Sequence, residues 1–436
     1  MTGPTSLTAS DSEARLHLED VIHHCLHCGM CLPVCPTYAL TSREESSPRG
    51  RIRLIRSVAD GSLECSPAFA DEMNFCLDCQ ACQTACPAGV QYGELVEEAR
   101  EWVAEAGLDS FATRWTKRLF LRGILSSHRR TKLFGRALRL YERIGLREAL
   151  DRSGILSLFS DRLAERHRLL PHASERFFDE FAPELTLAKG ERRGSVAFLS
   201  GCIMNVAFAD LHRESVELLA HNGHDVVVPK RQPCCGALHG HNGDRSEAQR
   251  LARETVDLFS KHPADALVVD SAGCAAHLKG YGTLLGDDPD YAERAKKLAQ
   301  ATREITEFLS QSGYAAPTVP VGETVTYHEA CHLVHSQRIS REPREMIASV
   351  PGVKFAELPE ATWCCGSAGI YNITRYDESM ELLDRKIDHI ASTGAAIVVT
   401  ANPGCHLQIE HGIRKRGLNV RVMHPVSLLH KGCGLP

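Results

Sequence analysis

The sequence predicts a multidomain α/β protein with a helical N-terminal domain, a helical connector and a C-terminal half built from a duplicated α/β unit. Three observations predict this architecture. The chain has 436 residues, which is too long for one ordinary domain. Its eighteen cysteines stand in short groups at metal-ligand spacing. The second half alternates short β-branched runs with helical segments, as parallel sheets do.

The charge balance and the N-terminus exclude several classes of protein. Lys and Arg total 50 against 55 Asp and Glu, and a formal net charge of −5 gives no reason to expect a nucleic-acid partner. The first 20 residues are polar and do not form a signal peptide, and no run approaches the roughly 20 apolar residues that span a bilayer. We therefore expect a cytoplasmic protein, either free or peripheral on the cytoplasmic face of the membrane.

Two cysteine runs near the N-terminus have the same spacing. Each reads Cys-x-x-Cys-x-x-Cys-x-x-x-Cys-Pro, from Cys25 to Pro36 and again from Cys76 to Pro87. This is the run of bacterial ferredoxins with two [4Fe–4S] clusters, in which the fourth cysteine binds the other cluster. The predicted ligands are Cys25, Cys28, Cys31 and Cys86 for one cluster, and Cys76, Cys79, Cys82 and Cys35 for the other. Zinc is the alternative metal, but its sites usually use separated Cys-x-x-Cys pairs.

The ferredoxin-type domain is predicted over residues 16–106. A helical pattern begins at Leu16 and leads to Cys25, and Pro48–Arg56 between the two runs is predicted to be a helix. The connector is predicted over 107–190. Its segment from Arg114 to Arg147 interleaves eleven basic residues with apolar ones, which suits an anionic lipid surface or an acidic partner. A solvated helix face or an internal contact is the alternative interpretation.

The C-terminal half is predicted to contain two repeats, over 191–316 and 317–436. The predicted strands are 196–199, 225–228 and 266–269 in the first repeat, and 325–327, 353–355 and 396–399 in the second. A helical segment over 290–312 is expected to join the repeats. The cysteines support the duplication, since a lone cysteine is followed by Cys-Cys-Gly after 32 or 33 positions and by a last cysteine 39 or 40 positions later.

Each repeat therefore offers four soft ligands to one group of loops. They are Cys202, Cys234, Cys235 and Cys274 in the first repeat, and Cys331, Cys364, Cys365 and Cys405 in the second. Ligand type and number predict a metal or cluster site, and one or two further Fe–S clusters. Buried thiols or a disulfide are the alternative, and Cys65 and Cys433 lie outside every motif. The histidines near these cysteines are candidates for iron binding or proton transfer, or hydrogen-bond a turn: His239, His241, His277, His328, His332, His335 and His406.

The layout resembles the heterodisulfide-reductase-related iron–sulfur proteins over about residues 20–430. That group includes electron-transfer subunits of glycolate oxidase, anaerobic glycerol-3-phosphate dehydrogenase and lactate-utilisation systems. The sequence motifs of this chain are most similar to those of the glycolate oxidase iron–sulfur branch. The motifs that carry the resemblance are Ser47–Ile52, Cys234–His239, His328–His332, Cys364–Tyr371 and Thr400–Cys405.

One departure from the group concerns the last cysteine of each repeat. Heterodisulfide reductases end each repeat with Cys-x-x-Cys, whereas this chain has Cys274-Ala-Ala-His277 and Cys405-His-Leu-Gln408. Four thiolates per repeat disfavour disulfide cleavage and leave open a four-ligand cluster or one in which His277 substitutes.

The resemblance implies a non-flavin subunit of an oxidoreductase complex. A partner FAD subunit would oxidise a 2-hydroxy acid, glycolate or lactate, and this chain would carry electrons to a quinone or another acceptor. It would hold no catalytic residue for substrate oxidation, and no Gly-x-Gly-x-x-Gly motif for flavin or nicotinamide is present. The alternatives are the electron-transfer subunit of an anaerobic glycerol-3-phosphate dehydrogenase, a heterodisulfide-reductase-like catalytic subunit, and a redox-sensing scaffold.

Overall fold

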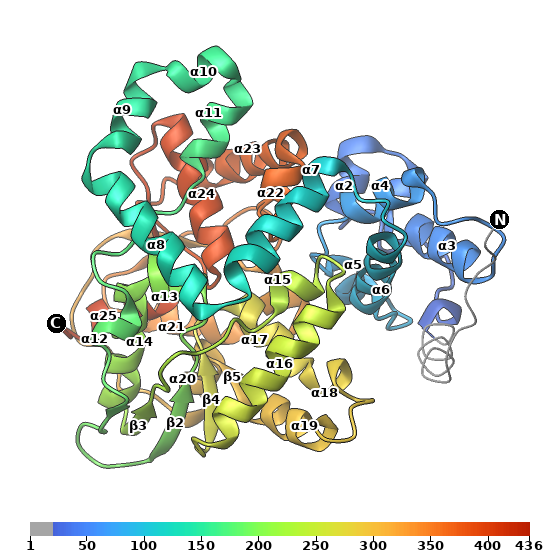
Figure 1. Ribbon diagram of the computed structural model, residues 1–436. Helices are drawn as coiled ribbons and strands as arrows, with labels where there is room; N and C mark the ends of the chain where they lie inside the picture. The colour runs from blue at the N-terminus through green and yellow to red at the C-terminus, as the bar shows by residue number, and fades with distance from the viewer. Residues whose placement is uncertain (1–20) are drawn as a thin grey trace.

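The computed structural model describes residues 21–436. Residues 16–20, half of the helix predicted from Leu16 to Cys25, lie outside these residues. Figure 1 shows the N-terminal helices packed against one side of a larger α/β body, and a helical arch, α8 to α11, that projects from the top of that body. The three regions expected from the sequence are therefore present.

The N-terminal region contains only helices among its described residues. Its helices are α2 (Pro36–Thr41), α3 (Pro48–Ala59), α4 (Pro67–Phe75), α5 (Ala81–Ala85) and α6 (Tyr92–Glu105), with a short 3₁₀ turn, η1, at Glu44–Ser46. Proline opens α2, α3 and α4, where its missing N–H is not needed. The Oγ of Ser47 accepts a hydrogen bond of 3.0 Å from Gly50 N and caps α3. The helix predicted from Pro48 to Arg56 is confirmed.

The connector is a chain of short helices. They are α7 (Phe111–Thr116), a π-helical segment η2 (Lys117–Leu125), α8 (His128–Arg143), α9 (Leu146–Ser153), α10 (Ile155–Phe159), α11 (Asp161–Arg168) and α12 (Phe178–Phe181). Leu121 and Leu125 are buried, whereas Leu158 is 85% exposed. Part of the basic character is used internally, because Lys117 Nζ lies 2.8 Å from Asp109 Oδ2 and Lys132 Nζ lies 2.9 Å from Asp179 Oδ2.

The C-terminal half contains two sheets with matching strand order. The first sheet runs β1-β3-β2-β4-β5 and the second β7-β6-β8-β9. Their strands are β1 (Leu185–Thr186), β2 (Gly194–Phe198), β3 (His224–Val227), β4 (Ala266–Val269), β5 (Thr302–Glu304), β6 (Thr324–Tyr327), β7 (Lys354–Phe355), β8 (Ile397–Val399) and β9 (Arg421–Met423). All neighbours are parallel except β1 and β3. The order β3-β2-β4-β5 matches β7-β6-β8-β9, so the duplication is structural.

Helices cover both sheets. The helices of the first repeat are α13 (Ile203–Ala207), α14 (Ala209–His221), α15 (Ala237–Gly240), α16 (Arg245–Ser260), α17 (Ala272–Lys279), α18 (Tyr281–Leu284), α19 (Ala292–Ala301) and α20 (Ile305–Ser312). Those of the second are the π-helical turn η3 (His332–Ser336), α21 (Arg341–Ser349), α22 (Tyr371–Thr374), α23 (Tyr376–Ser392), α24 (Pro403–Arg416) and α25 (Pro425–Gly432). One core joins the repeats, since Phe198 and Val268 share it with Tyr327 and Val399.

The segment 290–312 differs from the continuous helix expected from the sequence. Strand β5 interrupts it and pairs with β4, with Leu267 opposite Thr302. The physical reason lies at Glu304, whose side chain accepts a hydrogen bond of 2.8 Å from Thr306 N and caps a new helix, α20. The expected helix is therefore two helices and an edge strand of the first sheet.

Candidate metal centre

The first repeat brings its four predicted cysteines together at the carboxyl edge of its sheet. Cys202 follows β2, the pair Cys234–Cys235 follows β3, and Cys274 lies in the first turn of α17 after β4. Parallel neighbouring strands deliver these positions to one edge. The thiol of Cys202 contacts that of Cys234, and the thiol of Cys235 contacts both Cys234 and Cys274. Contact with Cys234, followed by burial, raises the pKa of Cys202 well above its ordinary value.

The second repeat repeats this arrangement. Cys331 follows β6, Cys364 and Cys365 lie on a loop, and Cys405 lies in the first turn of α24. Cys331 contacts Cys364, and Cys365 contacts Cys364 and Cys405. Contact with Cys364, followed by burial, raises the pKa of Cys331 well above its ordinary value. The structure thus brings together the four cysteines that the sequence singled out in each repeat.

These thiols are free, and they face one another across a shared space. All eighteen cysteines are unpaired, so the expected alternative of a disulfide is not present. One cavity of about 790 Å³ is lined by the eight repeat cysteines together with Cys76. The two cysteine loops also touch, because Ala272 N donates to Ala401 O at 3.1 Å and Gly273 N donates to Asn402 Oδ1 at 3.1 Å. Four clustered thiols per site, all buried or partly buried, match the soft donor set of an iron–sulfur cluster.

The four cysteines predicted to hold the second cluster are more deeply buried than the four predicted for the first. Cys76, Cys79 and Cys82 are each 8% exposed, and Cys35 is 6% exposed. Burial raises the pKa of Cys82 well above its ordinary value, and the nearby thiols of Cys79, Cys76 and Cys35 add to the shift. Cys35 therefore lies beside the second run, as the ligand exchange between the two runs requires.

The four cysteines predicted to hold the first cluster lie nearer the surface. Cys28 is exposed, whereas Cys25, Cys31 and Cys86 are partly buried and border one apolar core with Cys65. Burial raises the pKa of Cys31, with the thiols of Cys25 and Cys35 adding to the shift. This set is open to solvent at one side, where a partner can approach it.

The second ferredoxin-type run packs against the second repeat. Cys79 shares an apolar cluster with Cys364 and Tyr371. Burial raises the pKa of Cys79 well above its ordinary value, and Cys331 is the next largest cause. His332 Nε2 lies 3.0 Å from Asp78 O, which ties the two segments together. The cysteine sets of the N-terminal domain and of the second repeat are therefore neighbours.

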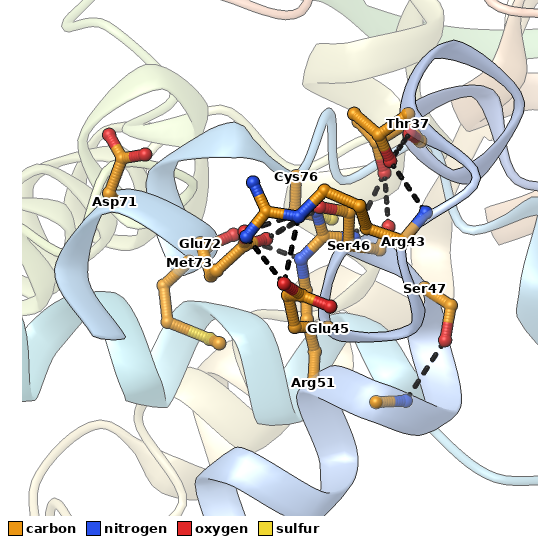
Figure 2. Close-up of polar contacts among 12 residues, drawn as sticks. Thr37, Arg43, Glu45, Ser46, Ser47, Arg51, Asp71, Glu72, Met73 and Cys76 are labelled. Carbon is orange, nitrogen blue, oxygen red and sulfur yellow. Dashed lines mark hydrogen bonds and ion pairs between the residues drawn. The ribbon is translucent and has the colours of Figure 1, made fainter. Parts of the chain in front are cut away.

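A buried guanidinium stands beside this run. Arg51 is 0% exposed; its Nε donates to Glu72 O at 2.9 Å and its Nη1 to Thr37 Oγ1 at 3.0 Å, as Figure 2 shows. Its Nη2 has no hydrogen-bond partner in residues 21–436, although Glu72 Oε2 lies 3.6 Å away. A buried cation with an unused donor fits an anionic cluster held by Cys35 and Cys76.

Arg100 provides a second buried cation at the domain boundary. Its Nε donates to Met73 O at 3.1 Å, its Nη2 to Cys76 O, and its Nη1 to His241 O at 2.6 Å. One side chain therefore joins the N-terminal domain to the first repeat. The charge also lies close to the second ferredoxin-type run.

The predicted histidines fall into two groups. His239, His241, His277, His328 and His332 lie near the cysteines, whereas His335 bonds Thr84 Oγ1 at 2.9 Å and His406 packs on Phe208 with 5.2 Å between ring centroids. His241 Nδ1 lies 3.3 Å from Asp78 Oδ2. Burial lowers the pKa of His241, but Glu97 and Asp78 raise it further, to about 10. Burial, with His241 as the next cause, lowers the pKa of His277 to about 3.

Sequence reasoning did not assign a role to Arg51, Arg100, Asp78 or Lys386. Arg51 lies inside a motif that carried the family resemblance, and it occupies the apolar face of α3 beside Ile52 and Ile55. Lys386 likewise sits among apolar positions of α23 and is 0% exposed. The sequence signal that could have identified Arg51 and Lys386 is a charged residue at an otherwise apolar position of a helix.

Over the described residues, no helix is long and apolar enough to cross a bilayer. This agrees with the expectation from the sequence that no segment spans a bilayer.

Family comparisons match every region of the chain. Residues 196–279 and 325–410 match the cysteine-rich domain, residues 21–90 match the 4Fe-4S dicluster domain, and residues 112–170 match the linker region of the glycolate oxidase iron-sulfur subunit. The chain therefore holds iron–sulfur clusters. The matched segments lie within the regions expected from the sequence.

Two glycolate oxidase iron-sulfur subunits match nearly the whole chain, and a shorter relative matches about half of it. The probable glycolate oxidase iron-sulfur subunit of Bacillus subtilis is 36% identical over 421 residues, which is 95% of each chain. The glycolate oxidase iron-sulfur subunit of Escherichia coli is 27% identical over 401 residues, covering 90% of this chain and 91% of the relative. Lactate utilization protein A of Halalkalibacterium halodurans is 30% identical over 242 residues, covering 54% of this chain and 96% of the relative.

A solved structure shares the fold. A hypothetical protein from Helicobacter pylori superposes with a TM-score of 0.54 at 9% identity, covering 99% of this chain and 74% of the other. The fold is therefore found in a protein of very different sequence. Because of its cysteine sets, its match to the linker region and its 36% identity to a relative over 95% of each chain, the chain belongs to the family of glycolate oxidase iron–sulfur subunits.

Proposed function

We propose that this chain is the electron-transfer subunit of a cytoplasmic 2-hydroxyacid dehydrogenase complex, with glycolate as the preferred substrate and lactate as the related alternative. A partner FAD subunit oxidises the substrate, and a quinone-type molecule accepts the electrons. The names of the relatives from Bacillus subtilis and Escherichia coli support the glycolate assignment. Lactate utilization protein A supports the alternative.

The observation that carries the proposal is the contact between two cysteine sets. Cys79 of the second ferredoxin-type run lies with Cys364 of the second repeat in one apolar cluster, and Cys331 is next to it. When bound, iron–sulfur clusters accept and donate single electrons, so they divide a two-electron oxidation into one-electron steps. A continuous series of cysteine sites supports transfer through the chain better than it supports a redox-sensing scaffold.

The ligand sets are part of this proposal. The two ferredoxin-type sites use Cys25, Cys28, Cys31 and Cys86, and Cys76, Cys79, Cys82 and Cys35; each repeat uses its own four cysteines. The domain limits predicted from the sequence, 16–106, 107–190, 191–316 and 317–436, are proposed with them. Arg51 and Arg100 hold positive charge beside the second run and thereby stabilise reduced, more anionic states there.

The test is anaerobic co-purification with the partner flavoprotein. We expect about eight iron atoms per chain from the two ferredoxin-type sites, with more from the repeats, and reduction of the iron signals in EPR when glycolate is added. Cys79→Ser should abolish reduction of the acceptor, whereas Cys433→Ser, outside every motif, should leave it unchanged. Stoichiometric zinc without reducible iron would refute the proposal. Reduction by glycerol-3-phosphate alone would move the chain to the competing family branch.

Peripheral membrane contact is proposed for the connector. Its exposed apolar residues are Phe111, Trp115, Leu119, Leu133, Leu140, Ile144, Leu146, Ile155, Leu158, Phe159 and Leu163. Exposed arginines accompany them, among them Arg118, Arg129, Arg130 and Arg143. Apolar and cationic side chains together on projecting helices suit an anionic bilayer surface.

Vesicle sedimentation tests this contact. The chain should sediment with vesicles that contain anionic lipid and not with neutral ones, and the paired change Leu158→Ser and Phe159→Ser should weaken sedimentation several-fold. Leu63→Ser, at an exposed position of the N-terminal domain outside the connector, is the matched control. If the paired variant sediments like the parent but no longer binds the flavoprotein, the face is a protein contact instead.

A further inference from the structure

The two repeats place different residues at one equivalent position beside their cysteines. Leu199 follows β2 and lies three residues before Cys202, whereas His328 follows β6 and lies three residues before Cys331. Their backbones make the same contact, since Leu199 N donates to Val268 O at 3.0 Å and His328 N donates to Val399 O at 2.9 Å. Both side chains are buried. A leucine in one site is therefore an imidazole in the other.

The imidazole of His328 lies among the cysteines of the second repeat. One of its ring nitrogens and the Sγ atoms of Cys365 and Cys405 all lie within 4.8 Å of one another, and all three residues are buried. Such a group can share one metal ion, because thiolates and imidazole both ligate iron. Cys331 and Cys364 complete the same thiol set. Five potential donors therefore converge where four were expected from the cysteines alone.

The ring nitrogens of His328 have no other use in the described chain. The residue is 1% exposed, and neither Nδ1 nor Nε2 makes a hydrogen bond of normal geometry within residues 21–436. A buried polar group left without a partner is unfavourable. By contrast, each of the neighbouring histidines His239, His241 and His332 uses one ring nitrogen in a hydrogen bond. An iron atom would satisfy the unused nitrogen of His328.

We propose that His328 is an iron ligand in the second repeat and shares its iron with Cys365 or Cys405. The second site then has a mixed nitrogen and sulfur ligand set. The first site has Leu199 at the same position, and a leucine side chain offers no nitrogen ligand. The proposal rests on the proposed cysteine ligands of the second repeat. Histidine in place of cysteine raises the potential of an iron–sulfur centre, as in Rieske proteins.

The test uses the full chain labelled with ¹⁵N in its histidines. In the parent protein, ENDOR of the reduced or oxidised iron signals should show a strongly coupled ¹⁵N nucleus. His328→Leu, which installs the side chain of the equivalent position in the first repeat, should remove this coupling and lower the midpoint potential of one centre. His328→Cys should keep the iron, remove the ¹⁵N coupling and lower the potential further.

Two control variants make the result specific. His332→Leu, beside Cys331, and His411→Leu, a buried histidine on the same helix as Cys405, should both keep the coupling. No coupled ¹⁵N in the parent, or a coupling that survives in His328→Leu, would overturn the proposal. The test does not depend on the physiological substrate: a coupling lost only in the His328 variants supports the ligand even in a protein that glycolate fails to reduce.

Discussion

The two α/β repeats share a frame of four cysteines but surround it differently. In the first repeat Leu199 stands where the second has His328. Thr255 likewise stands where the second repeat has Lys386. The two positions are equivalent because Ala248 packs on Gly236 and Ser379 packs on Gly366, and Thr255 and Lys386 each follow seven residues later. Lys386 Nζ donates to Glu360 O at 2.5 Å, and burial lowers its pKa to about 8 although Cys365 and Cys364 oppose the shift. Duplication of a fold therefore does not duplicate the chemistry of its site.

Lys386 places a buried ammonium group beside the cysteines of the second repeat, where the first repeat has a threonine. A buried ammonium group close to the cysteines stabilises added negative charge, and the equivalent threonine cannot. The second repeat is also the one that contacts the second ferredoxin-type run, through Cys79 and Cys364. We infer that electrons reach the second repeat before the first.

The largest expected effect is the loss of one site by removing one ligand. Cys235→Ser should remove the iron of the first repeat alone, and Cys365→Ser that of the second alone. The reason is that the thiol contacts of each of these two residues are with cysteines of its own repeat. Iron analysis and EPR of each variant measure this. If either variant loses the iron of both repeats, the two sites form a single centre and the comparison between them fails.

The next effect concerns the glycine of each Cys-Cys-Gly turn. Gly366 and Gly236 have φ of +87° and +89°, so alanine is strained at both positions. A Cβ would meet Ser379 O at 2.5 Å at Gly366 but Ala248 O at 3.2 Å at Gly236. Gly366→Ala should therefore lower the free energy of unfolding by about 3 kcal/mol and Gly236→Ala by about 1 kcal/mol. Thermal midpoints that are equal for the two variants would contradict the difference in packing.

The buried carboxylate of Asp270 has no counterpart at the equivalent position of the second repeat and should make the first repeat acid-sensitive. Asp270 Oδ2 lies 2.8 Å from His212 Nδ1 and accepts a hydrogen bond of 2.8 Å from Ser215 Oγ, whereas Ala401 holds the equivalent position in the second repeat. Burial raises the pKa of Asp270, but His212 lowers it further, below its ordinary value. Asp270→Asn should lower stability by about 1–3 kcal/mol at pH 7.

The sign of the pH dependence follows from the lowered pKa of Asp270. Its contribution is complete above the unfolded-state pKa of about 4 and is lost as the pH falls through the folded-state pKa. The thermal midpoints of the parent and of Asp270→Asn should therefore converge below about pH 4. Ala401→Ser is the control in the second repeat. A gap between parent and variant that widens on acidification would contradict this account.

The smallest effect concerns a hydroxyl that only the first repeat has. Tyr281 Oη donates to Cys235 O at 2.6 Å and is buried, and the equivalent position of the second repeat is Gly412. Tyr281→Phe should cost about 0.5–1.5 kcal/mol and leave the iron content unchanged. The thermal midpoint and iron analysis measure both. Loss of iron in this variant would show that the carbonyl of Cys235 controls the site.

Much of this fold could be predicted because its signals are local. The runs 196–199, 266–269 and 396–399 are β-branched and flanked by turns, and each overlaps a strand. The edge strands β1, β5 and β9 were missed. Leu185–Thr186 is only two residues long and lies in the stretch expected to be a helical connector, and Thr302–Glu304 and Arg421–Met423 carry polar or charged residues. All three become strands only by pairing with β3, β4 and β8. Pairing across the chain has no local signature.

The site was predictable in its cysteines and not in its surroundings. Fixed spacing identified the thiols, but Arg51, Lys386 and Asp78 reach them from helices and loops whose positions depend on the packing of three regions. His328 was noted as a neighbour of the cysteines, whereas its unused ring nitrogens became visible only in the structure. Contacts between distant segments therefore decided what sequence patterns left open.

The guanidinium of Arg100 limits movement of the N-terminal domain relative to the rest of the protein. Because it bonds Met73 O and Cys76 O on one side and His241 O on the other, the N-terminal domain cannot swing away from the body without breaking several buried hydrogen bonds. Arg375, which pairs with Asp71, fastens the same domain to the second repeat. We therefore expect electrons to pass through a chain whose domains keep fixed positions, without a domain movement at each transfer. Its rate should depend on how partners dock and leave, and a longer or looser connector should leave internal transfer unchanged.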